Sequence, residues 1–402
     1  MKRLAVLVRA FLLVLPLACL GAEDGLSTRI EALSFRSSTD TWARSPFQRI
    51  ATQPDHVWNT ELRPDLVWQD EEFSSTLRPR LALAAAPGEA HAESWLNEGW
   101  LRWRPREGLS LQGGREVLLW GPAMFWNPSN PFFTDNNKAN PKREIAGKDF
   151  LRTRWQLDRN FAITGISQLG RGHRASGTQR MDALKLDWVG EDASAAAIVA
   201  ATPGASASWQ GWVQWTATDA MLVYGELAWR EGKTVSMPYE SSGPTGWQVR
   251  NQPGRRSVLG VIGAAYTFDN DWTLHAELWR NGSGLNNAEA AQLGRATAAL
   301  GTQPRGLADP QLGELISEPA PLRRHYLGLQ LGNGDSAGVS WKLRLTRNLD
   351  DESIEGVAML DYDLNDSLKL WLNLMRRNGR ADSEYGRWVR GSSMLGVTWY
   401  AW

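Results

Sequence analysis

The sequence predicts an all-β protein, a single transmembrane antiparallel β-barrel of about 18 strands (roughly 16–20), with short periplasmic turns and long extracellular loops. Three observations support this prediction. Apolar and polar residues alternate with period two through most of the chain, each alternating segment is about ten residues long, and short connections between segments alternate with long ones.

The alternation is clearest over Val339–Thr346 and Leu368–Leu374, where every second residue is apolar. Successive side chains of a strand point to opposite faces, so this pattern gives each strand one apolar and one polar face. Strands of about ten residues are long enough to cross a bilayer when tilted. The predicted strands are 26–35, 56–68, 73–84, 93–104, 109–119, 148–157, 160–169, 180–189, 193–201, 206–216, 220–230, 256–267, 271–280, 322–331, 336–347, 353–363, 367–376 and 390–400.

The connections between these segments fall into two classes. Those on one side are brief, as at 158–159 and 268–270, whereas the loops 120–147, 231–255 and 281–321 on the other side are long. Such asymmetry is typical of outer-membrane barrels. Aromatic residues close to the short turns are expected to form a girdle at the membrane interface: Trp103, Trp155, Trp188, Trp215, Trp272, Tyr266, Phe268 and Tyr362.

The N-terminus indicates where the protein goes. Lys2 and Arg3 precede an apolar stretch from Leu4 to Leu20, and small residues follow at Gly21-Ala22. This pattern predicts a secretory signal over residues 1–22, a barrel over 23–402, and export to the outer membrane of a Gram-negative bacterium. The 44 basic and 44 acidic residues balance, which argues against a general nucleic-acid partner, and one Cys excludes a disulfide framework.

Charged residues on the polar phase of the strands predict a wet lumen. Six arginines fall on neighbouring strands of one wall, where few carboxylates are expected, and two further basic residues lie on a later strand. Guanidinium groups bind carboxylate and phosphate, so this wall predicts either a path for anions or a structural brace of ion pairs. The candidate path residues are Arg78, Arg80, Arg102, Arg104, Arg152, Arg154, Lys342 and Arg344.

The loop 120–147 is expected to fold into the lumen. Its four prolines stiffen it, and its aromatic residues would be poorly placed in water. The loop therefore either lines a constriction or merely caps the barrel. The candidate constriction residues are Trp126, Asn136, Asn137, Lys138, Lys142 and Arg143.

Several short motifs resemble those of Gram-negative outer-membrane β-barrel porins, in particular the alginate-export and capsule-assembly families. They are Gly114-Arg115-Glu116-Val117, Trp120-Gly121-Pro122, Asn136-Asn137 and Asn140-Pro141. The resemblance implies an 18-stranded barrel with an arginine-rich lumen for an acidic polymer, a role that Arg78, Arg80, Arg152 and Arg154 would take. The final residues, Gly396 to Trp402, resemble the C-terminal signal that the barrel-assembly machinery binds.

Together these features predict an outer-membrane channel that passes an anionic saccharide or exopolysaccharide. Two alternatives stay open: a general or solute-specific uptake porin, and a plugged capsule- or polysaccharide-binding barrel whose loop 281–321 forms a helix over 287–300. Outer-membrane lipid is the expected surrounding. No catalytic residue, metal site or cofactor is expected, because none of the five histidines has a convincing partner by spacing and no H-E-x-x-H motif is present.

Overall fold

The computed structural model describes residues 25–42, 56–133, 142–173, 180–231, 235–316, 322–334 and 338–402. The expected signal over 1–22, and three of the candidate constriction residues (Asn136, Asn137 and Lys138), lie outside the described residues.

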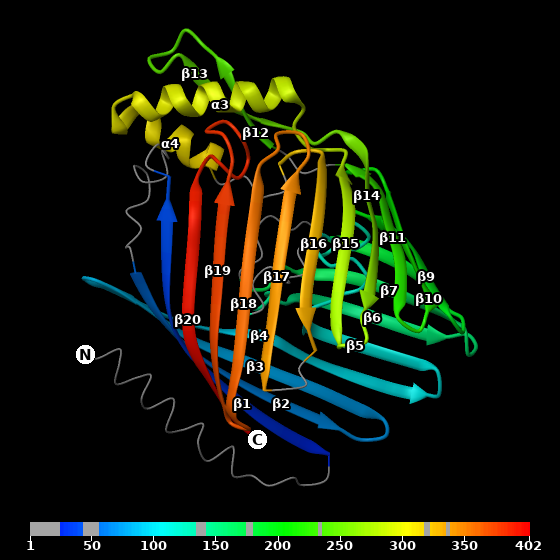
Figure 1. Cartoon of the computed structure of the whole chain (residues 1–402). Coiled ribbons are helices and arrows are strands. Elements are labelled where there is room, and N and C mark those ends of the chain that lie inside the picture. The colour runs from blue at the N-terminus through cyan, green and yellow to red at the C-terminus, as the bar shows by residue number, and fades with distance from the viewer. Residues whose placement is uncertain are drawn as a thin grey trace.

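Eighteen strands form one antiparallel sheet that closes on itself (Figure 1). Each strand pairs with the next barrel strand along the chain, and β1 closes the barrel by pairing with β20. The predicted fold class is therefore confirmed. The barrel strands are β1 (Leu26–Thr41), β2 (His56–Gln69), β3 (Phe73–Ala86), β4 (Glu89–Arg106), β5 (Leu109–Glu116), β6 (Lys148–Gln156), β7 (Phe161–Gly170), β8 (Met181–Val189), β9 (Ala193–Ala201), β10 (Ser208–Thr218), β11 (Met221–Glu231), β14 (Arg256–Thr267), β15 (Trp272–Asn281), β16 (His325–Asn333), β17 (Val339–Asn348), β18 (Ile354–Asn365), β19 (Leu368–Asn378) and β20 (Val389–Ala401).

The residues between β11 and β14 and between β15 and β16 form a small layer at the end of the barrel that carries the long loops (Figure 1). A hairpin of β12 (Val235–Glu240) and β13 (Trp247–Gln252) packs there on α3 (Asn287–Thr302) and α4 (Arg305–Ile316). Asn286 caps α3 by accepting a hydrogen bond from the backbone N–H of Glu289. Neither helix is long and apolar enough to span a membrane.

The outer face of the barrel is apolar. Large side chains alternate outward along the strands, as Leu184, Leu186 and Trp188 do on β8, and they remain exposed because lipid rather than protein covers this face. All eight aromatic residues expected near the short turns are exposed. We assign the short-turn end to the periplasm and the end with α3 and α4 to the extracellular side.

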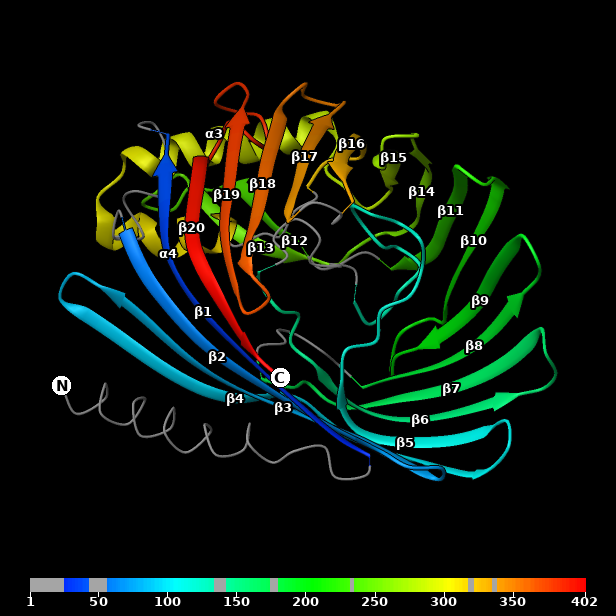
Figure 2. The same ribbon diagram turned by 60° about the horizontal axis from the view of Figure 1, so that its bottom comes forward.

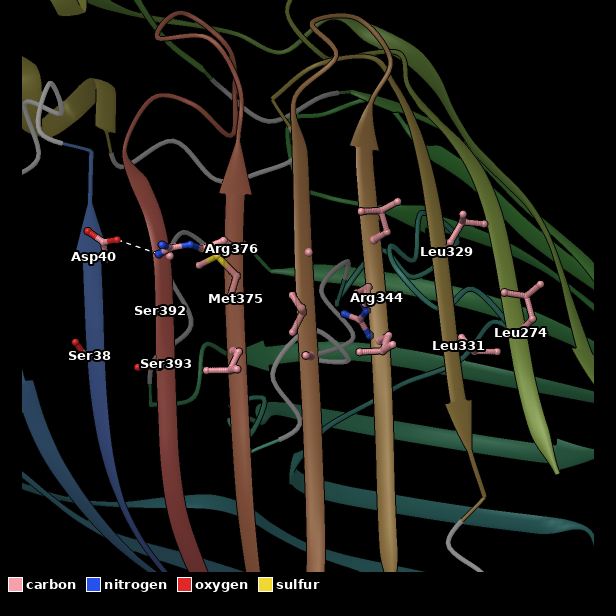
Figure 3. A pocket seen from close by; sticks show the side chains of 17 residues that line it. Ser38, Asp40, Leu274, Leu329, Leu331, Arg344, Met375, Arg376, Ser392 and Ser393 are labelled. Atoms are coloured by element: carbon pink, nitrogen blue, oxygen red, sulfur yellow. Dashed lines mark hydrogen bonds and ion pairs between the residues drawn. The ribbon is translucent and has the colours of Figure 1, made fainter. Parts of the chain in front are cut away.

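One part of this outer face is hollowed. A groove runs across the outward positions from β15 to β20 and onto β1, and Figure 3 shows leucines at one end and the pair Asp40–Arg376 at the other.

The lumen contains an apolar core of its own. Residues of the β5–β6 loop, among them Leu118, Phe132 and Phe133, pack against the inner wall formed by β6 to β9. Figure 2 views the barrel more from the periplasmic end, and segments between β5 and β6 are visible inside the ring of strands. A loop that supplies core residues to the inside of a barrel is fixed there by burial of its apolar surface.

Candidate functional site

The loop between β5 and β6 folds into the barrel, and a glutamate on the opposite wall holds its first half. Glu226 of β11 is 4% exposed. Its two carboxylate oxygens accept hydrogen bonds from the backbone N–H groups of Ala123 (2.8 Å) and Ser129 (3.1 Å). Gly121 makes this approach possible, because it has a φ of +87° and a Cβ at this position would stand 2.5 Å from Glu226 Oε1.

A second glutamate holds the same turn of the loop. Glu277 of β15, 1% exposed, accepts hydrogen bonds from the backbone N–H groups of Met124 and Phe125, the latter at 3.1 Å. The hydroxyl of Tyr224 donates to the same carboxylate at 2.8 Å. Hydrogen bonds to a carboxylate are stronger than those between neutral groups, so this pair of buried glutamates fixes residues 121–129 against β11 and β15.

Aromatic stacking adds to this anchor. Phe125 stacks on Trp279 of β15 with ring centroids 5.4 Å apart, and Trp279 stacks in turn on Tyr326 of β16 at 5.2 Å. The guanidinium of Arg344 lies 5.1 Å from the centre of the Phe125 ring and donates to Gln330 at 2.9 Å. Trp126, a candidate constriction residue, is buried in the same cluster rather than open to the lumen.

The second half of the loop returns along another part of the wall. Lys142 pairs with Asp361 of β18 at 2.9 Å, and its backbone carbonyl accepts from Arg63 of β2 at 2.6 Å. Glu144 accepts two hydrogen bonds from Arg80 of β3, at 2.5 and 2.7 Å. The described parts of the loop therefore contact β2, β3, β11, β15 and β18, and the loop narrows the lumen. Arg143, the remaining described candidate on this loop, is exposed.

Two of the wall arginines, Arg78 and Arg80, form ion pairs with carboxylates. Arg78 contacts Asp65 at 3.4 Å and also Glu98. Arg80 contacts Asp65 at 2.9 Å in addition to Glu144. The expectation that few carboxylates share this wall is therefore wrong. The register explains the Asp65 and Glu98 pairs because both carboxylates lie on strands that pair with β3, whereas Glu144 comes from the folded loop.

Three other wall arginines, Arg102, Arg152 and Arg154, form a basic patch with fewer acids. Arg102 donates to Gln112 at 2.8 Å, and Arg152 donates to the same amide oxygen at 2.7 Å. Arg152 also pairs with Glu116 at 3.0 Å, and Arg154 lies 3.7 Å from Asp187. Arg102 is close enough to Arg152 and Arg154 for mutual electrostatic repulsion.

Lys185, which pairs with Asp187, lies 5.4 Å from the centre of the Trp120 ring and links this patch to the base of the folded loop. We define the basic patch as Arg102, Arg152, Arg154 and Lys185.

The remaining candidates have other contacts. Arg104 donates to the backbone carbonyls of Asp70 (3.0 Å) and Glu71 (3.3 Å), so it braces the periplasmic turn between β2 and β3. Lys342 lies on the inward phase of β17 and is exposed, and Arg344 on the same phase is buried against Phe125. The structure thus brings only part of the predicted set to one place.

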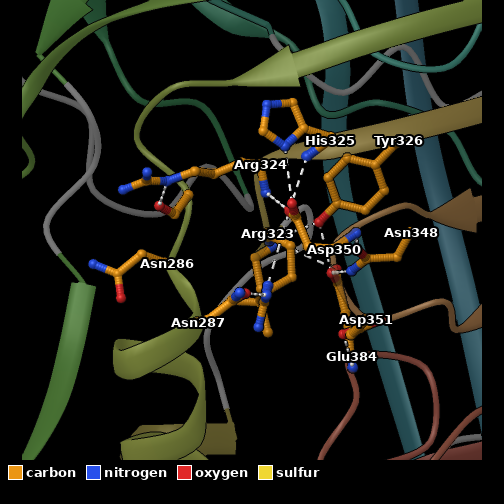
Figure 4. Close-up of polar contacts among 12 residues, drawn as sticks. Asn286, Asn287, Arg323, Arg324, His325, Tyr326, Asn348, Asp350, Asp351 and Glu384 are labelled. Carbon is orange, nitrogen blue, oxygen red and sulfur yellow. Dashed lines mark hydrogen bonds and ion pairs between the residues drawn. The ribbon is translucent and has the colours of Figure 1, made fainter.

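A buried polar cluster ties the extracellular loops together above the lumen (Figure 4). Glu384 accepts hydrogen bonds from the hydroxyl of Tyr326 (2.6 Å), the amide of Asn348 (2.8 Å) and the backbone N–H of Leu322 (3.1 Å). Nearby, Asp350 accepts from His325 Nδ1 at 2.9 Å. These contacts join segments from β15–β16, β17–β18 and β19–β20.

Strand alternation puts Glu226 and Glu277 on the inward phase of β11 and β15, but it does not reveal that they accept hydrogen bonds from the loop backbone. A signal was present in Gly121, which lies in a Trp-Gly-Pro motif where a left-handed conformation is needed. The partner of that glycine could not be deduced, since Glu226 lies about a hundred positions along the chain.

No protein-family model and no curated protein matches this chain. Solved structures do. Pseudomonas aeruginosa OccK11 (OpdR) has a TM-score of 0.54 and 12% identity over 95% of this chain and 98% of that one. Pseudomonas aeruginosa OprD has a TM-score of 0.55 and 9% identity over 94% and 97%. Pseudomonas aeruginosa OccK5 (OpdH) has a TM-score of 0.53 and 10% identity over 94% and 98%.

At these identities the similarity shows a common barrel fold. The closed 18-stranded sheet and the apolar outer face identify the chain as an integral protein of the Gram-negative outer membrane. The comparisons do not show the resemblance to alginate-export and capsule-assembly barrels, which stays a prediction.

Proposed function

We propose that this chain is an outer-membrane porin that passes small anionic solutes, acidic saccharides among them, past the folded loop. The observation that carries the proposal is the position of this loop: Glu226 and Glu277 anchor it on one wall, and its base lies beside the basic patch.

The anchored loop favours small solutes over a polymer. Its first half is fixed by buried hydrogen bonds and aromatic packing, so widening the lumen would break contacts at several strands at once. An exopolysaccharide would have to thread through this narrowed section. A small solute needs no such movement.

The basic patch favours anions. Four cationic side chains, Arg102, Arg152, Arg154 and Lys185, face two carboxylates, Glu116 and Asp187. This surplus of positive charge stands in a lumen with low-dielectric walls, which focus the field on a passing solute. Guanidinium groups also bind carboxylates through paired hydrogen bonds, as an acidic sugar would require.

Two partners complete the proposal. Lipid surrounds the apolar outer face. The barrel-assembly machinery is the proposed partner of β20, whose end carries the aromatic residues Trp399, Tyr400 and Trp402.

The test is the reversal potential of the refolded full barrel in a planar bilayer under a salt gradient. We expect anion selectivity, and a several-fold fall in the anion-to-cation permeability ratio in the triple variant Arg102→Gln, Arg152→Gln, Arg154→Gln. Arg250→Gln is the control. Arg250 lies on the extracellular hairpin of β12 and β13, where it donates to Gln248 and lies over the Tyr239 ring.

An unchanged ratio in the triple variant would contradict the anion path. Swelling of proteoliposomes then separates solute sizes: entry of galacturonate, with exclusion of its polymer, supports the small-solute channel. A folded barrel with no conductance would overturn the channel and favour a polysaccharide-binding surface barrel.

A further inference from the structure

The groove on the outer face of the barrel has an apolar floor. It has a volume of about 800 Å³, within the range of about 300–1,000 Å³ in which many ligand pockets fall. Leucines on β15, β16 and β17 line one side, and small residues on β18 and β20 leave the space open between neighbouring larger side chains. The floor residues that matter here are Leu274, Leu329, Leu331, Leu343, Ala358 and Leu374.

The opposite end of the groove is charged (Figure 3). Arg376 of β19 reaches across β20 to pair with Asp40 of β1 at 3.0 Å. Gly391 lies between them, and a Cβ there would stand 2.9 Å from Arg376 Nη1. Arg390 lies 3.7 Å from the same carboxylate.

The side chains of Arg376 and Arg390 are both exposed. The side chain of Arg376 is 64% exposed and that of Arg390 is 48% exposed. Arg36 and Arg347 also lie on outward positions of β1 and β17 and are exposed. Among the described outward positions of β15–β20 and β1, Asp40 is the one acid in the extracellular half, so the charged end keeps a positive surplus.

The excess of arginines over acids on the lipid-facing side calls for a negatively charged partner. An arginine that faces hydrocarbon is unfavourable, most strongly at the bilayer midplane and less near the interface. A phosphate at the level of the lipid head groups would offset that cost through charge-assisted hydrogen bonds. The apolar floor that runs from the arginines toward β15 has the chemistry to accept an acyl chain.

We propose that this groove binds one lipid of the extracellular leaflet, with its phosphate on Arg376 and Arg390 and an acyl chain along the leucine floor. The site lies outside the barrel and does not depend on what passes through the lumen. Gly391 is kept free of a side chain so that Arg376 can lie over β20, where Asp40 orients it.

The test counts lipids on the purified full-length barrel by native mass spectrometry after addition of lipid A, a phosphorylated and acylated disaccharide. We expect one tightly retained lipid on the unmodified protein. The double variant Arg376→Gln, Arg390→Gln removes the charges, and Ala358→Trp fills the floor. Each is expected to lower retention at least several-fold.

Two control variants make the same kinds of change outside the groove. Arg180→Gln removes an exposed arginine that pairs with Asp182 beside β8, and Ala197→Trp adds the same bulk on the outward face of β9. Both are expected to retain the lipid. Retention of dephosphorylated lipid A equal to that of lipid A would contradict the proposed phosphate contact.

Two results would overturn the proposal. One is unchanged retention in both groove variants when heat-modifiable migration shows that they are folded. The other is a shift from an oligomer to a monomer in the groove variants with no lipid in the wild-type spectrum, which would assign the groove to a second copy of the chain.

Discussion

Gly121 leaves no room for a side chain beside Glu226: a Cβ built on the glycine would stand 2.5 Å from the carboxylate oxygen Oε1. The same oxygen accepts the backbone N–H of Ala123 two residues later. The glycine and the carboxylate thus form one contact that anchors the folded loop on β11.

Substitution of this glycine should release the loop. Gly121→Ala must accommodate both a positive φ and the collision with Glu226, and strain of this kind costs about 1–3 kcal/mol. We expect higher single-channel conductance with more current noise, because the loop leaves its anchored position. Gly165→Ala is the control, since its Cβ would meet nothing within 4 Å. Equal conductance in the two variants would show that the anchor does not limit the pore.

The apolar core inside the lumen should hold the folded loop as firmly as the hydrogen bonds to Glu226 and Glu277 do. Phe150 of β6 is 1% exposed and contacts Phe132 and Phe133 of the loop, with ring centroids 5.1 and 6.3 Å away. Phe150→Ala should lower the free energy of unfolding by about 3–5 kcal/mol and raise conductance.

Its neighbour Leu151 provides the comparison, because it faces outward and is 52% exposed. Leu151→Ala should change stability much less and leave conductance unchanged, as measured by urea unfolding in lipid vesicles and by bilayer recording. A larger loss in the Leu151 variant would mean that the inner core does not support the loop.

The buried polar cluster around Glu384 should become less stable as the pH rises. Burial raises the pKa of Glu384 above its ordinary value, although Tyr326 and the N–H of Leu322 donate hydrogen bonds to it. Asp351 and Arg387 also face this carboxyl. Because the folded cluster favours the protonated form, its contribution is complete below the ordinary pKa of a glutamate and is lost as the pH rises through the raised pKa.

The contribution of Asp350 to the stability of this cluster depends on pH in the opposite direction, and it changes only at lower pH. Burial alone would raise the pKa of Asp350, but hydrogen bonds from the His325 side chain and from the backbone of Arg324 and His325 hold it below its ordinary value. Its contribution is lost only as the pH falls through that depressed pKa. The loss of stability with rising pH is therefore assigned to Glu384.

Hydrogen exchange of the amides in 379–388, corrected for intrinsic rates, measures this effect. Protection should be greater at pH 5 than at pH 8 in the unmodified protein and nearly independent of pH in Glu384→Gln. The same pH dependence in both proteins would assign the effect to another group.

The barrel could be predicted from the sequence because its cause is local. Alternating residues such as Leu343, Lys342 and Arg344 show which side faces lipid without any knowledge of their partners. The hairpin of β12 and β13 was missed within the loop 231–255. Its strands have six residues each, include Pro238, and lie outside the lipid belt, so they lack the length and the pattern that marked the others.

The contacts of the candidate site could not be predicted from the sequence pattern, because they join segments that are distant in the chain. Arg80 was correctly placed on the inward phase of β3, but its partner Glu144 comes from a loop 64 positions away. The pattern alone therefore favours an anion path and leaves a brace of ion pairs as the alternative. The pairs of Arg78 with Asp65 and Glu98 follow from the strand register, whereas the pair of Arg80 with Glu144 depends on the folded position of that loop.

The closure of the barrel between β1 and β20 has a kinetic consequence. Leu33 pairs with Thr398, so the hydrogen bonds that remove the last free edge join residues separated by almost the whole described chain. Every other strand pair of the barrel joins segments that are much closer in the sequence, so this seam requires the largest loss of chain entropy. Until it forms, two strands expose unpaired N–H and C=O groups to the bilayer. Substitutions that weaken the seam should therefore both slow barrel formation and lower the stability of the finished barrel.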